Sequence, residues 1–449
     1  MARPAHPFDG LDTPAVARAL SQIADRDEDL ADAYFERLEE LTLPAEGDAP
    51  GVRLRREEGL AIRLVRDGHS WMAARDEITP AAFSESLRRV ARALPSAFYP
   101  EPRLEVSPPG AASGTEELAD FPLAVARAVR ARHVAFPLRL TVRRHRREIQ
   151  VVGPRLVPEA ETETYYSLEA EMPWGRWGTL LPGLDGAAEE VAGALVERFR
   201  CRNAPPPEGR SDAVVVLGSG AAAVLLHEAV AHALEADSLA LSGGGAARGS
   251  AAERAVGVAL GPEGLNVLDD PSTAPEPVRR RSDDEGSAVT RRWLLEAGVV
   301  RQPLADRAWA RGSDVLLPGA GRRASRHEPP GPRSTHLELL PGDVPEQDLV
   351  AEADDGFLVP ELAGGRLDPV SGRLVLDVPC ARRIRSGTPA DPVGPFRLVG
   401  AVAGLLEHAV AVGSTVHPGG AGWCAKGGRK LPVWATAPSL RLDGVEVEA

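Results

Sequence analysis

Two histidines and a glutamate lie close together near the middle of the chain, where residues 225–237 read LLHEAVAHALEAD. His227, Glu228 and His232 form the pattern HExxxH. Imidazole nitrogens bind Zn²⁺, and a carboxylate beside them can move protons at a water on the metal. The stretch therefore predicts a metal site with hydrolytic chemistry. Histidines on alanine-rich helices also occur as merely packed or exposed side chains, so the pattern needs further support.

The segment that carries this pattern is expected to be helical, because alanine, leucine and glutamate favour helix and an apolar run leads into it. On an α-helix, residues four apart share a face, whereas residues five apart are offset by about 140°. His227 and His232 can therefore bind one ion only if the helix bends or includes a π-type turn with an extra residue. We predict such a distortion between Glu228 and His232.

A catalytic zinc needs three protein ligands and one open position, so a third ligand must come from elsewhere. Cys424 lies in the glycine-rich stretch GGAGWCAKGG, where backbone can approach a site closely and Lys426 could lower the thiol pKa. A lone cysteine is also often a small buried apolar residue. His417, His327 and His336 are competing candidates for the third ligand.

A second motif overlaps the first. After the apolar run VVVL, Gly218, Gly220 and Ala223 give GxGxxA between a predicted strand and helix, and Asp237 follows at about the ribose-binding distance. A dinucleotide-binding enzyme that uses residues 218–223 is therefore an alternative. Against it, Asp237 lies within a continuing helical pattern rather than at the end of a second strand, and no alternation of strands and helices follows.

The size and charge of the chain exclude several classes of protein. Its 449 residues predict two or three domains. An apolar content of 43%, a charged content of 26% and a net charge of −13 are typical of a soluble protein and argue against nucleic-acid binding. The basic runs 143–147 and 279–281 are interpreted as solvated faces.

The cysteines and the apolar stretches bear on the compartment. Cys201, Cys380 and Cys424 are far apart and odd in number, so no disulfide framework is expected. The N-terminus lacks the pattern of a secretory signal, and the apolar stretch 213–226 is too short to span a bilayer. We therefore expect a cytoplasmic protein without membrane association.

The order of predicted elements indicates an α+β fold. We expect an N-terminal α+β domain over 1–205, made of a small unit over about 1–94, a linker over about 95–114 and a strand-rich unit over about 115–205. A C-terminal domain with a mixed or antiparallel sheet is expected over 206–449 and would carry the distorted HExxxH helix. Helices are expected over 13–24, 79–94, 187–200 and 398–412. Strands are expected over 31–43, 52–55, 61–65, 70–74, 138–152, 162–172, 213–217, 266–270, 357–359 and 374–378, and a flexible loop over 243–250.

Four motifs follow one another in an order that matches a known family. They are HEAVAHALEAD at 227–237, SDDEG at 282–286, RR at 322–323 with PRSTH at 332–336 and LPG at 340–342, and GGAGWCAKGG at 419–428 with LPV and PSLRLD after it. Over about 213–448 the sequence resembles the TldD/PmbA family of zinc metallopeptidases, also called modulators of DNA gyrase, and within it the TldD-type, metal-bearing member. The resemblance is weaker over 32–94.

The resemblance implies an activity and a set of site residues. His227, His232 and Cys424 would bind one Zn²⁺ per active subunit, and Glu228 would be the general base on the zinc-bound water. The substrates would be unfolded or leader peptides, bound as an added strand along a sheet edge. A dimer is implied, either with a metal-free PmbA/TldE-type subunit or with a second copy. Further candidates for substrate binding are His336, Arg333 and His327.

The chain departs from the family pattern in two places. Alanines 231, 233 and 236 stand where the family usually has glycine, and glycine would ease the bend that the histidine spacing demands. This departure motivates the alternative of a catalytically inactive TldE/PmbA-like binding or regulatory subunit. His336 replaces a common asparagine, and it could bind substrate, stabilise an oxyanion or simply form a hydrogen bond in a loop.

Overall fold

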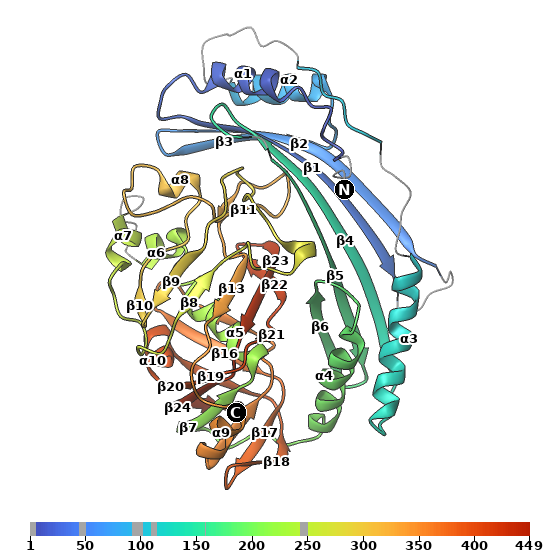
Figure 1. Ribbon diagram of the computed structural model, residues 1–449, viewed down its shortest axis with the longest axis vertical. Helices are drawn as coiled ribbons and strands as arrows, with labels where there is room; N and C mark the ends of the chain where they lie inside the picture. Colours follow the sequence, from blue (N-terminus) through green and yellow to red (C-terminus); the bar gives the residue numbers. More distant parts are fainter. Residues whose placement is uncertain (1–5, 45–50, 92–101, 109–114, 158, 243–249) are drawn as a thin grey trace.

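The computed structural model describes residues 6–44, 51–91, 102–108, 115–157, 159–242 and 250–449. The chain has an α+β structure, which confirms the predicted fold class. A long curved sheet from the N-terminal part arches over further sheets from the C-terminal part (Figure 1). The strands of the first sheet all precede residue 182 and those of the other sheets begin at residue 210. The predicted boundary at 205–206 falls in the segment between them.

The first sheet consists of six antiparallel strands in the order β3-β2-β1-β4-β5-β6. Its strands are β1 Leu30–Leu43, β2 Arg53–Arg66, β3 His69–Arg75, β4 Arg139–Val152, β5 Ala160–Met172 and β6 Gly175–Leu181. Asp67 and Gly68, both with positive φ, form the hairpin turn between β2 and β3. The separate strands predicted over 52–55 and 61–65 are one long strand, β2. β6 is the last strand, so its outer edge has no strand partner among the described residues.

Four helices pack on this sheet, two at each end (Figure 1). They are α1 Thr13–Ile23, α2 Pro80–Ala91, α3 Thr115–Ala131 and α4 Ala187–Cys201. Asp12 caps α1, since its Oδ1 accepts a hydrogen bond from Ala15 N at 2.9 Å. α3 has no counterpart among the predicted helices, although Glu116 and Glu117 in its first turn suit a helix N-terminus. The predicted linker over 95–114 lies largely outside the described residues.

The C-terminal part contains two large sheets and a small one. The nine-stranded sheet has the order β15-β16-β19-β24-β7-β14-β17-β18, with β20 on β24, and the seven-stranded sheet has the order β10-β9-β8-β13-β23-β21, with β22 on β23. The strands of the nine-stranded sheet are β7 Arg210–Leu217, β14 Asp355–Val359, β15 Gly364–Leu367, β16 Arg373–Val378, β17 Ala381–Arg385, β18 Thr388–Val393, β19 Phe396–Ala401, β20 Ala409–Val412 and β24 Leu440–Glu448. Those of the seven-stranded sheet are β8 Val267–Asp269, β9 Arg292–Glu296, β10 Val299–Val300, β13 His336–Leu339, β21 His417–Pro418, β22 Gly422–Lys426 and β23 Arg429–Ala437. β11 Gly321–Arg322 and β12 Gly331–Pro332 form the small sheet.

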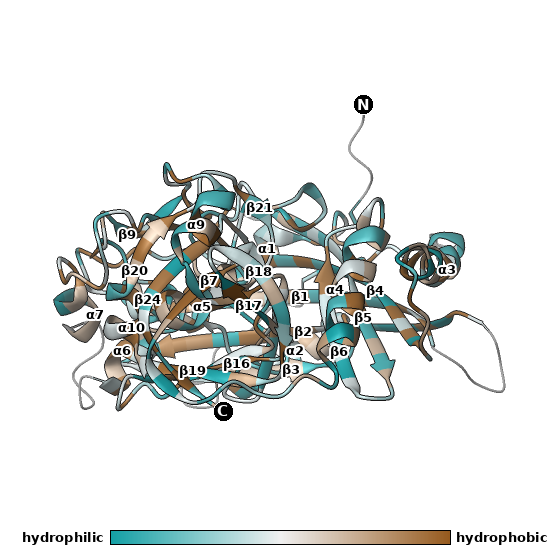
Figure 2. Ribbon diagram, turned by 90° about the horizontal axis from the view of Figure 1, so that it is seen from below, coloured by the Kyte–Doolittle hydropathy of each residue, from teal (hydrophilic) through white to brown (hydrophobic). Residues whose placement is uncertain are grey.

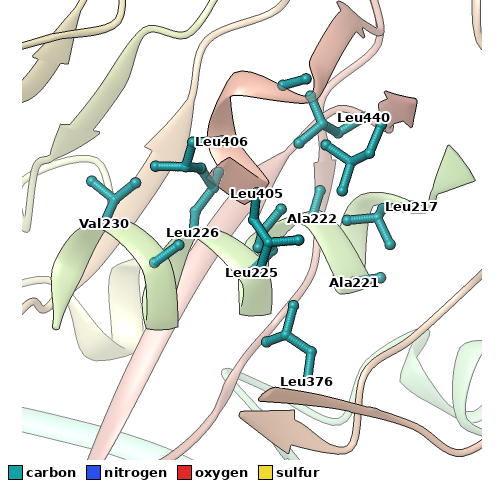
Figure 3. Packing of buried hydrophobic residues seen from close by; sticks show 14 of the residues in the cluster. Leu217, Ala221, Ala222, Leu225, Leu226, Val230, Leu376, Leu405, Leu406 and Leu440 are labelled. Carbon is teal, nitrogen blue, oxygen red and sulfur yellow. The ribbon is translucent and has the colours of Figure 1, made fainter. Parts of the chain in front are cut away.

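The helix α5 Ser219–Leu226 lies at the centre of the C-terminal part. Leucines and alanines on almost every side of it are buried against both large sheets and α10 Val402–Glu407 (Figure 3). Apolar residues gather on inner strands such as β24 in Figure 2, where polar residues cover much of the outside. The remaining helices are α6 Ala236–Ser242, α7 Ser250–Ala255, α8 Arg307–Ala310, α9 Glu346–Glu352 and the 3₁₀ turn Glu276–Val278. The helix predicted over 398–412 is confirmed only for 402–407, because residues at both ends of the range pair as β19 and β20.

Buried ion pairs join the N-terminal sheet to the C-terminal part. Arg63 on β2 contacts both Asp32 on β1 and Glu285, and Arg147 on β4 contacts Asp284 at 3.3 Å. All five of these side chains are less than a tenth exposed. The acidic segment 282–286 therefore lies at a buried interface between the two parts of the chain. The interpretation of the basic runs as solvated faces is also wrong for Arg147 and Arg280, because each of these side chains is paired with buried carboxylates.

Cys201 at the end of α4 and Cys380 after β16 form a disulfide across 179 residues. The expectation that the cysteines form no disulfide is therefore wrong for this pair. Its partners come from separate parts of the chain, and connectivity of this kind cannot be deduced from spacing. Among the helices of the described residues, none has both the length and the apolar character that a membrane crossing requires. The loop predicted over 243–250 lies almost wholly outside the described residues.

Candidate metal centre

The chain leaves the regular α-helix where the histidine spacing demands it. Residues His227–Ala231 form a π-helical turn after α5, and His232 N donates a hydrogen bond to His227 O at 3.0 Å. This i→i+5 bond takes up one residue more than an α-helical turn. The rings of His227 and His232 lie with their centroids 4.6 Å apart. The turn therefore brings both imidazoles to one side of the helix, as the spacing predicts.

Cys424, near the C-terminal end of the chain, lies beside the two histidines. It lies on β22, which pairs with β23, and its Sγ is 3.4 Å from His232 Nε2. One ligand atom from each of His227, His232 and Cys424 lies within 4.8 Å of the others, and all three residues are buried. Within the part of the chain that the structure describes, these residues make the one such group of three or more potential ligands.

The donor set fits a bound zinc ion. Two imidazoles and a thiolate are ordinary zinc ligands, and ligand distances of about 2.0–2.3 Å put the ligand atoms of a tetrahedral site roughly 3.3–3.8 Å apart. The distance between Cys424 Sγ and His232 Nε2 falls in that range. His227 Nε2 is buried and has no hydrogen-bond partner among the described residues, which is costly for a polar atom unless something binds it.

A buried carboxylate stands behind His232. Glu235 is fully buried, and its Oε1 lies 3.0 Å from His232 Nδ1. Burial would raise the pKa of Glu235, but the charge and hydrogen bond of His232 and the charges of Arg333 and Lys426 lower it to about 2. A carboxylate on one ring nitrogen fixes the tautomer and turns the other nitrogen toward a metal. Sequence reasoning did not assign Glu235 a role, although its position three residues after His232 was a usable signal.

Two cations hold that carboxylate in turn. Lys426, two residues after Cys424, contacts Glu235 Oε2 and lies 2.9 Å from Asp237 Oδ1. Arg333 Nη1 lies 3.4 Å from Glu235 Oε2. Lys426 therefore forms an ion pair with Glu235. The sequence alone instead suggests that Lys426 acts directly on the Cys424 thiol. Arg333, predicted to bind substrate, belongs to this charged group behind the ligands.

Glu228 follows His227 in the π turn and is half-buried, whereas the three ligand residues are buried. Burial raises its pKa, and the charge of His232 opposes this rise. A Cβ on Gly365, at the start of β15, would lie 2.6 Å from Glu228 Cγ, so the glycine lets this strand pass close to the carboxylate. Burial also lowers the pKa of His227 to about 3, with the charge of His232 acting in the same direction, so the ring is a neutral donor near pH 7.

The other candidate ligands lie elsewhere. His336 is buried on β13, with Nδ1 3.1 Å from Thr273 Oγ1 and 3.2 Å from Asp270 O. His327 is exposed, and its Nε2 lies 2.7 Å from Asp76 Oδ1 in the N-terminal part. His417 is exposed on β21. None of these three belongs to the ligand group among the described residues. Ser334, whose Oγ lies 3.4 Å from His227 Nδ1, carried no sequence signal.

The glycine-rich turn before α5 does not resemble a pyrophosphate site. A Cβ on Gly218 would lie 3.3 Å from backbone atoms of Pro360, and a Cβ on Gly419 would lie 3.0 Å from the backbone of Gly220. These glycines let chain segments pack against the helix N-terminus. Asp237, the expected ribose ligand, is paired with Lys426. The dinucleotide-binding alternative has no support from this packing.

Known proteins resemble the chain in both sequence and fold. Residues 210–449 match the family described as "PmbA/TldA metallopeptidase C-terminal domain". A "Metalloprotease TldD homolog" of Buchnera aphidicola subsp. Acyrthosiphon pisum is 30% identical over 234 residues, 52% of this chain and 47% of that protein. A "Metalloprotease" of Methanothermobacter thermautotrophicus is 31% identical over 243 residues, 54% of this chain and 51% of that one. The match spans about half the length of these relatives.

Two solved structures share the fold over nearly the whole chain. TldE from Thermococcus kodakarensis superimposes with a TM-score of 0.71 at 20% identity, covering 97% of this chain and 100% of its own. A putative modulator of a DNA gyrase from Thermotoga maritima gives 0.70 at 19% identity, with coverages of 97% and 99%. At such identities the likeness concerns the fold alone. The family match covers more than half of the chain, and the chain therefore belongs to the PmbA/TldD metallopeptidase family.

Proposed function

We propose that the protein is a zinc-dependent peptidase that hydrolyses peptide bonds in unfolded or leader-peptide substrates. The observation that supports this proposal best is the grouping of His227, His232 and Cys424, with the half-buried Glu228 next to His227 in the chain. His227, His232 and Cys424 would hold the ion. Bound Zn²⁺ would supply Lewis-acid polarisation of the scissile carbonyl and acidify water at the site.

Glu228 supplies the proton transfers in this proposal. Its carboxylate accepts a proton from the attacking water as the oxygen bonds to the scissile carbonyl carbon. It then donates that proton to the leaving nitrogen as the C–N bond breaks, which regenerates the carboxylate. A raised pKa suits both steps, because the group must gain and lose a proton near neutral pH. Contact with Gly365 restrains the side chain in place.

The surrounding strands can hold an extended peptide with little regard to its sequence. β22 pairs with β23 alone among the described strands, and β6 is the last strand of its sheet. These two edges lie near each other beside Cys424 (Figure 1). A peptide added along such an edge is bound through its backbone, which suits unfolded substrates. We further propose a dimer, either with a PmbA/TldE-type subunit or with a second copy of the chain.

The alternative of an inactive binding subunit rested on alanines 231, 233 and 236. None of the three has a positive φ, so the backbone conformation does not require glycine at these positions. The proximity of His227, His232 and Cys424 supports the peptidase, and no observation favours the inactive subunit over it.

The test combines metal content with cleavage of an unstructured peptide. Purified wild type is expected to hold one zinc per active subunit and to cleave the peptide. Glu228→Gln is expected to keep the metal and to lose activity by about 10²–10⁴-fold, the usual contribution of a general base. Glu407→Gln, at an exposed helical glutamate, serves as the matched control. Full activity of a metal-loaded Glu228→Gln would show that the assigned base is wrong.

A further inference from the structure

A single exposed line runs down the helix that leads to the metal centre. From Gly220 to His232, only Gly220, Val224 and Glu228 are not buried. These residues are four apart, so they lie one above another on the same side of the helix. Every other side of α5 packs against the core. Gly220, Val224 and Glu228 therefore mark the one side of this helical segment that the core does not bury completely.

A cavity of about 540 Å³ opens on this line. Its walls come from Ser219, Gly220 and Val224, from the segments 360–363 and 418–421, and from β6 and α4 across the groove. Val224 is one helical turn, about 6 Å, from Glu228. The two segments continue directly into the metal centre, because Gly365 contacts Glu228 and Cys424 follows three residues after Ala421. The volume is within the range of about 300–1,000 Å³ that is common for ligand pockets.

The walls of this cavity are mainly apolar. Trp177, Leu180 and Val191 line it from the N-terminal part, and Val224 and Leu362 from the C-terminal part. Charged residues also line it, namely Arg176, Glu190, Glu197, Arg198 and Glu361. Two of them neutralise each other, since Arg198 Nε lies 2.7 Å from a carboxylate oxygen of Glu361. Glu361 also accepts a hydrogen bond from Trp177 Nε1 at 3.1 Å, so the indole presents a satisfied polar end and an apolar body.

Gly193 lines the cavity on the α4 side. It lies in the interior of that helix, where glycine is less favourable than alanine. Its φ is not positive, and a Cβ built there would meet no described atom within 4 Å. Neither backbone conformation nor packing therefore requires glycine at this position. By contrast, a Cβ on Gly178 in the same cavity would lie 3.0 Å from a backbone oxygen.

We propose that this cavity is the subsite for a large apolar side chain of the peptide substrate, aromatic ones above all, and that Gly193 sets the size it accepts. The inference rests on the proposed peptidase function and adds a preference to it. An extended peptide advances about 3.3 Å per residue, so the side chain in the cavity belongs to a residue within about two positions of the scissile bond. Backbone pairing then gives affinity, and the cavity selects among sequences.

The test uses unstructured peptides that differ only by phenylalanine or alanine at each position near the cleaved bond. We expect wild type to favour one phenylalanine peptide over its alanine counterpart by at least about 10-fold in kcat/KM, since burial of an aromatic ring drives its binding. Gly193→Leu is expected to abolish this preference, and Gly193→Ala to reduce it. Leucine and alanine favour helix over glycine, so both variants are expected to fold, as circular dichroism would verify.

Gly404→Leu is the matched control. Gly404 also lies inside a helix, a Cβ there would also meet no described atom within 4 Å, and it does not line the cavity. This variant should keep the wild-type preference. A wild type without preference, or a folded Gly193→Leu that retains it, would overturn the proposal.

Binding by the Glu228→Gln variant, measured by fluorescence anisotropy of labelled peptides, separates the subsite from the catalytic function. If wild type cleaves nothing but Glu228→Gln still binds the phenylalanine peptide more tightly, and the added Gly193→Leu removes that difference, the peptidase assignment fails and the subsite stands. If wild type cleaves both peptides equally and Glu228→Gln binds them equally, the peptidase assignment stands and the subsite fails.

Discussion

The carboxylate of Glu235 allows a quantitative test of how the metal centre is held. Its Oε1 lies 3.0 Å from His232 Nδ1, so it orients the ring and increases the basicity of Nε2, which faces Cys424. Replacing Glu235 by glutamine is expected to weaken zinc binding about 10–100-fold, the usual effect of losing such a partner. This loss corresponds to roughly 1.4–2.7 kcal/mol of binding free energy.

The glutamine variant isolates charge from shape. Because Glu235 has a pKa of about 2, it is a carboxylate at any pH at which the protein is handled. Glutamine keeps an oxygen that can accept a hydrogen bond from His232, but it removes the negative charge that strengthens the imidazole as a donor. Glu235→Ala removes the hydrogen bond as well and leaves Lys426 and Arg333 with fewer partners. We expect its loss of zinc affinity to exceed that of Glu235→Gln.

Asp237→Asn is the matched control for this comparison. Asp237 contacts the same two cations, Lys426 at 2.9 Å and Arg333 at 3.5 Å. Within the described residues it has no ion pair or hydrogen bond with His232. Its side chain is 31% exposed, so its ion pairs are partly screened by solvent. We therefore expect Asp237→Asn to change zinc affinity by about threefold at most.

Each variant is titrated with zinc in competition with a chromophoric chelator, after circular dichroism has established that it is folded. The expected order of zinc affinity is wild type, Asp237→Asn, Glu235→Gln and Glu235→Ala, from tight to weak. Equal affinities of wild type and Glu235→Gln would refute the role assigned to the carboxylate. Equal losses in Asp237→Asn and Glu235→Gln would also refute it, because the two cations rather than His232 would then be the common cause.

Two further predictions concern stability. Ala231 is fully buried in the π turn and does not have a positive φ. Ala231→Gly should therefore lower the free energy of unfolding, measured by denaturant titration, by about 1 kcal/mol. An increase in this free energy would mean that the turn is strained. Burial and the charge of Glu285 raise the pKa of Asp306 to about 8, from 3.8, so folding favours its protonated form. Stability should then fall as the pH rises from about 5 to about 8, by at most about 1.4 kcal/mol per pH unit for this group. Asp306→Asn can keep the cap on Trp309 N and should flatten this fall in thermal melts, whereas an unchanged slope would contradict the assignment.

Local geometry was the part of the site that the sequence could predict. The five-residue spacing of His227 and His232 is incompatible with one face of an α-helix, and a π turn follows from that alone. The third ligand, by contrast, could not be chosen from Cys424, His417 and the other histidines by local geometry. It depends on which strand the chain brings beside the π turn, and spacing over nearly 200 residues does not contain that information.

Burial of charge was the part that the sequence could not predict. The acidic segment 282–286 has the composition of a surface turn, but its partners Arg63 and Arg147 lie on strands of the first sheet, more than 130 residues away. Each charge is tolerated inside only because the other is there. At position 231, by contrast, the backbone does not require the glycine that is usual in the family, because Ala231 does not have a positive φ.

The N-terminal sheet has a direct part in positioning the third metal ligand. Successive side chains of β22 point to opposite sides, so Cys424 and Lys426 face His232 and Glu235 while Trp423 faces away from them. The Trp423 ring packs edge-on against His145 on β4 and Tyr165 on β5, with centroids 5.7 and 5.9 Å away. Among the described strands, β22 pairs only with β23. The aromatic contact restrains the face of β22 that points away from His232 and Glu235. Although the family match is confined to residues 210–449, the geometry of Cys424 therefore depends on the preceding half of the chain.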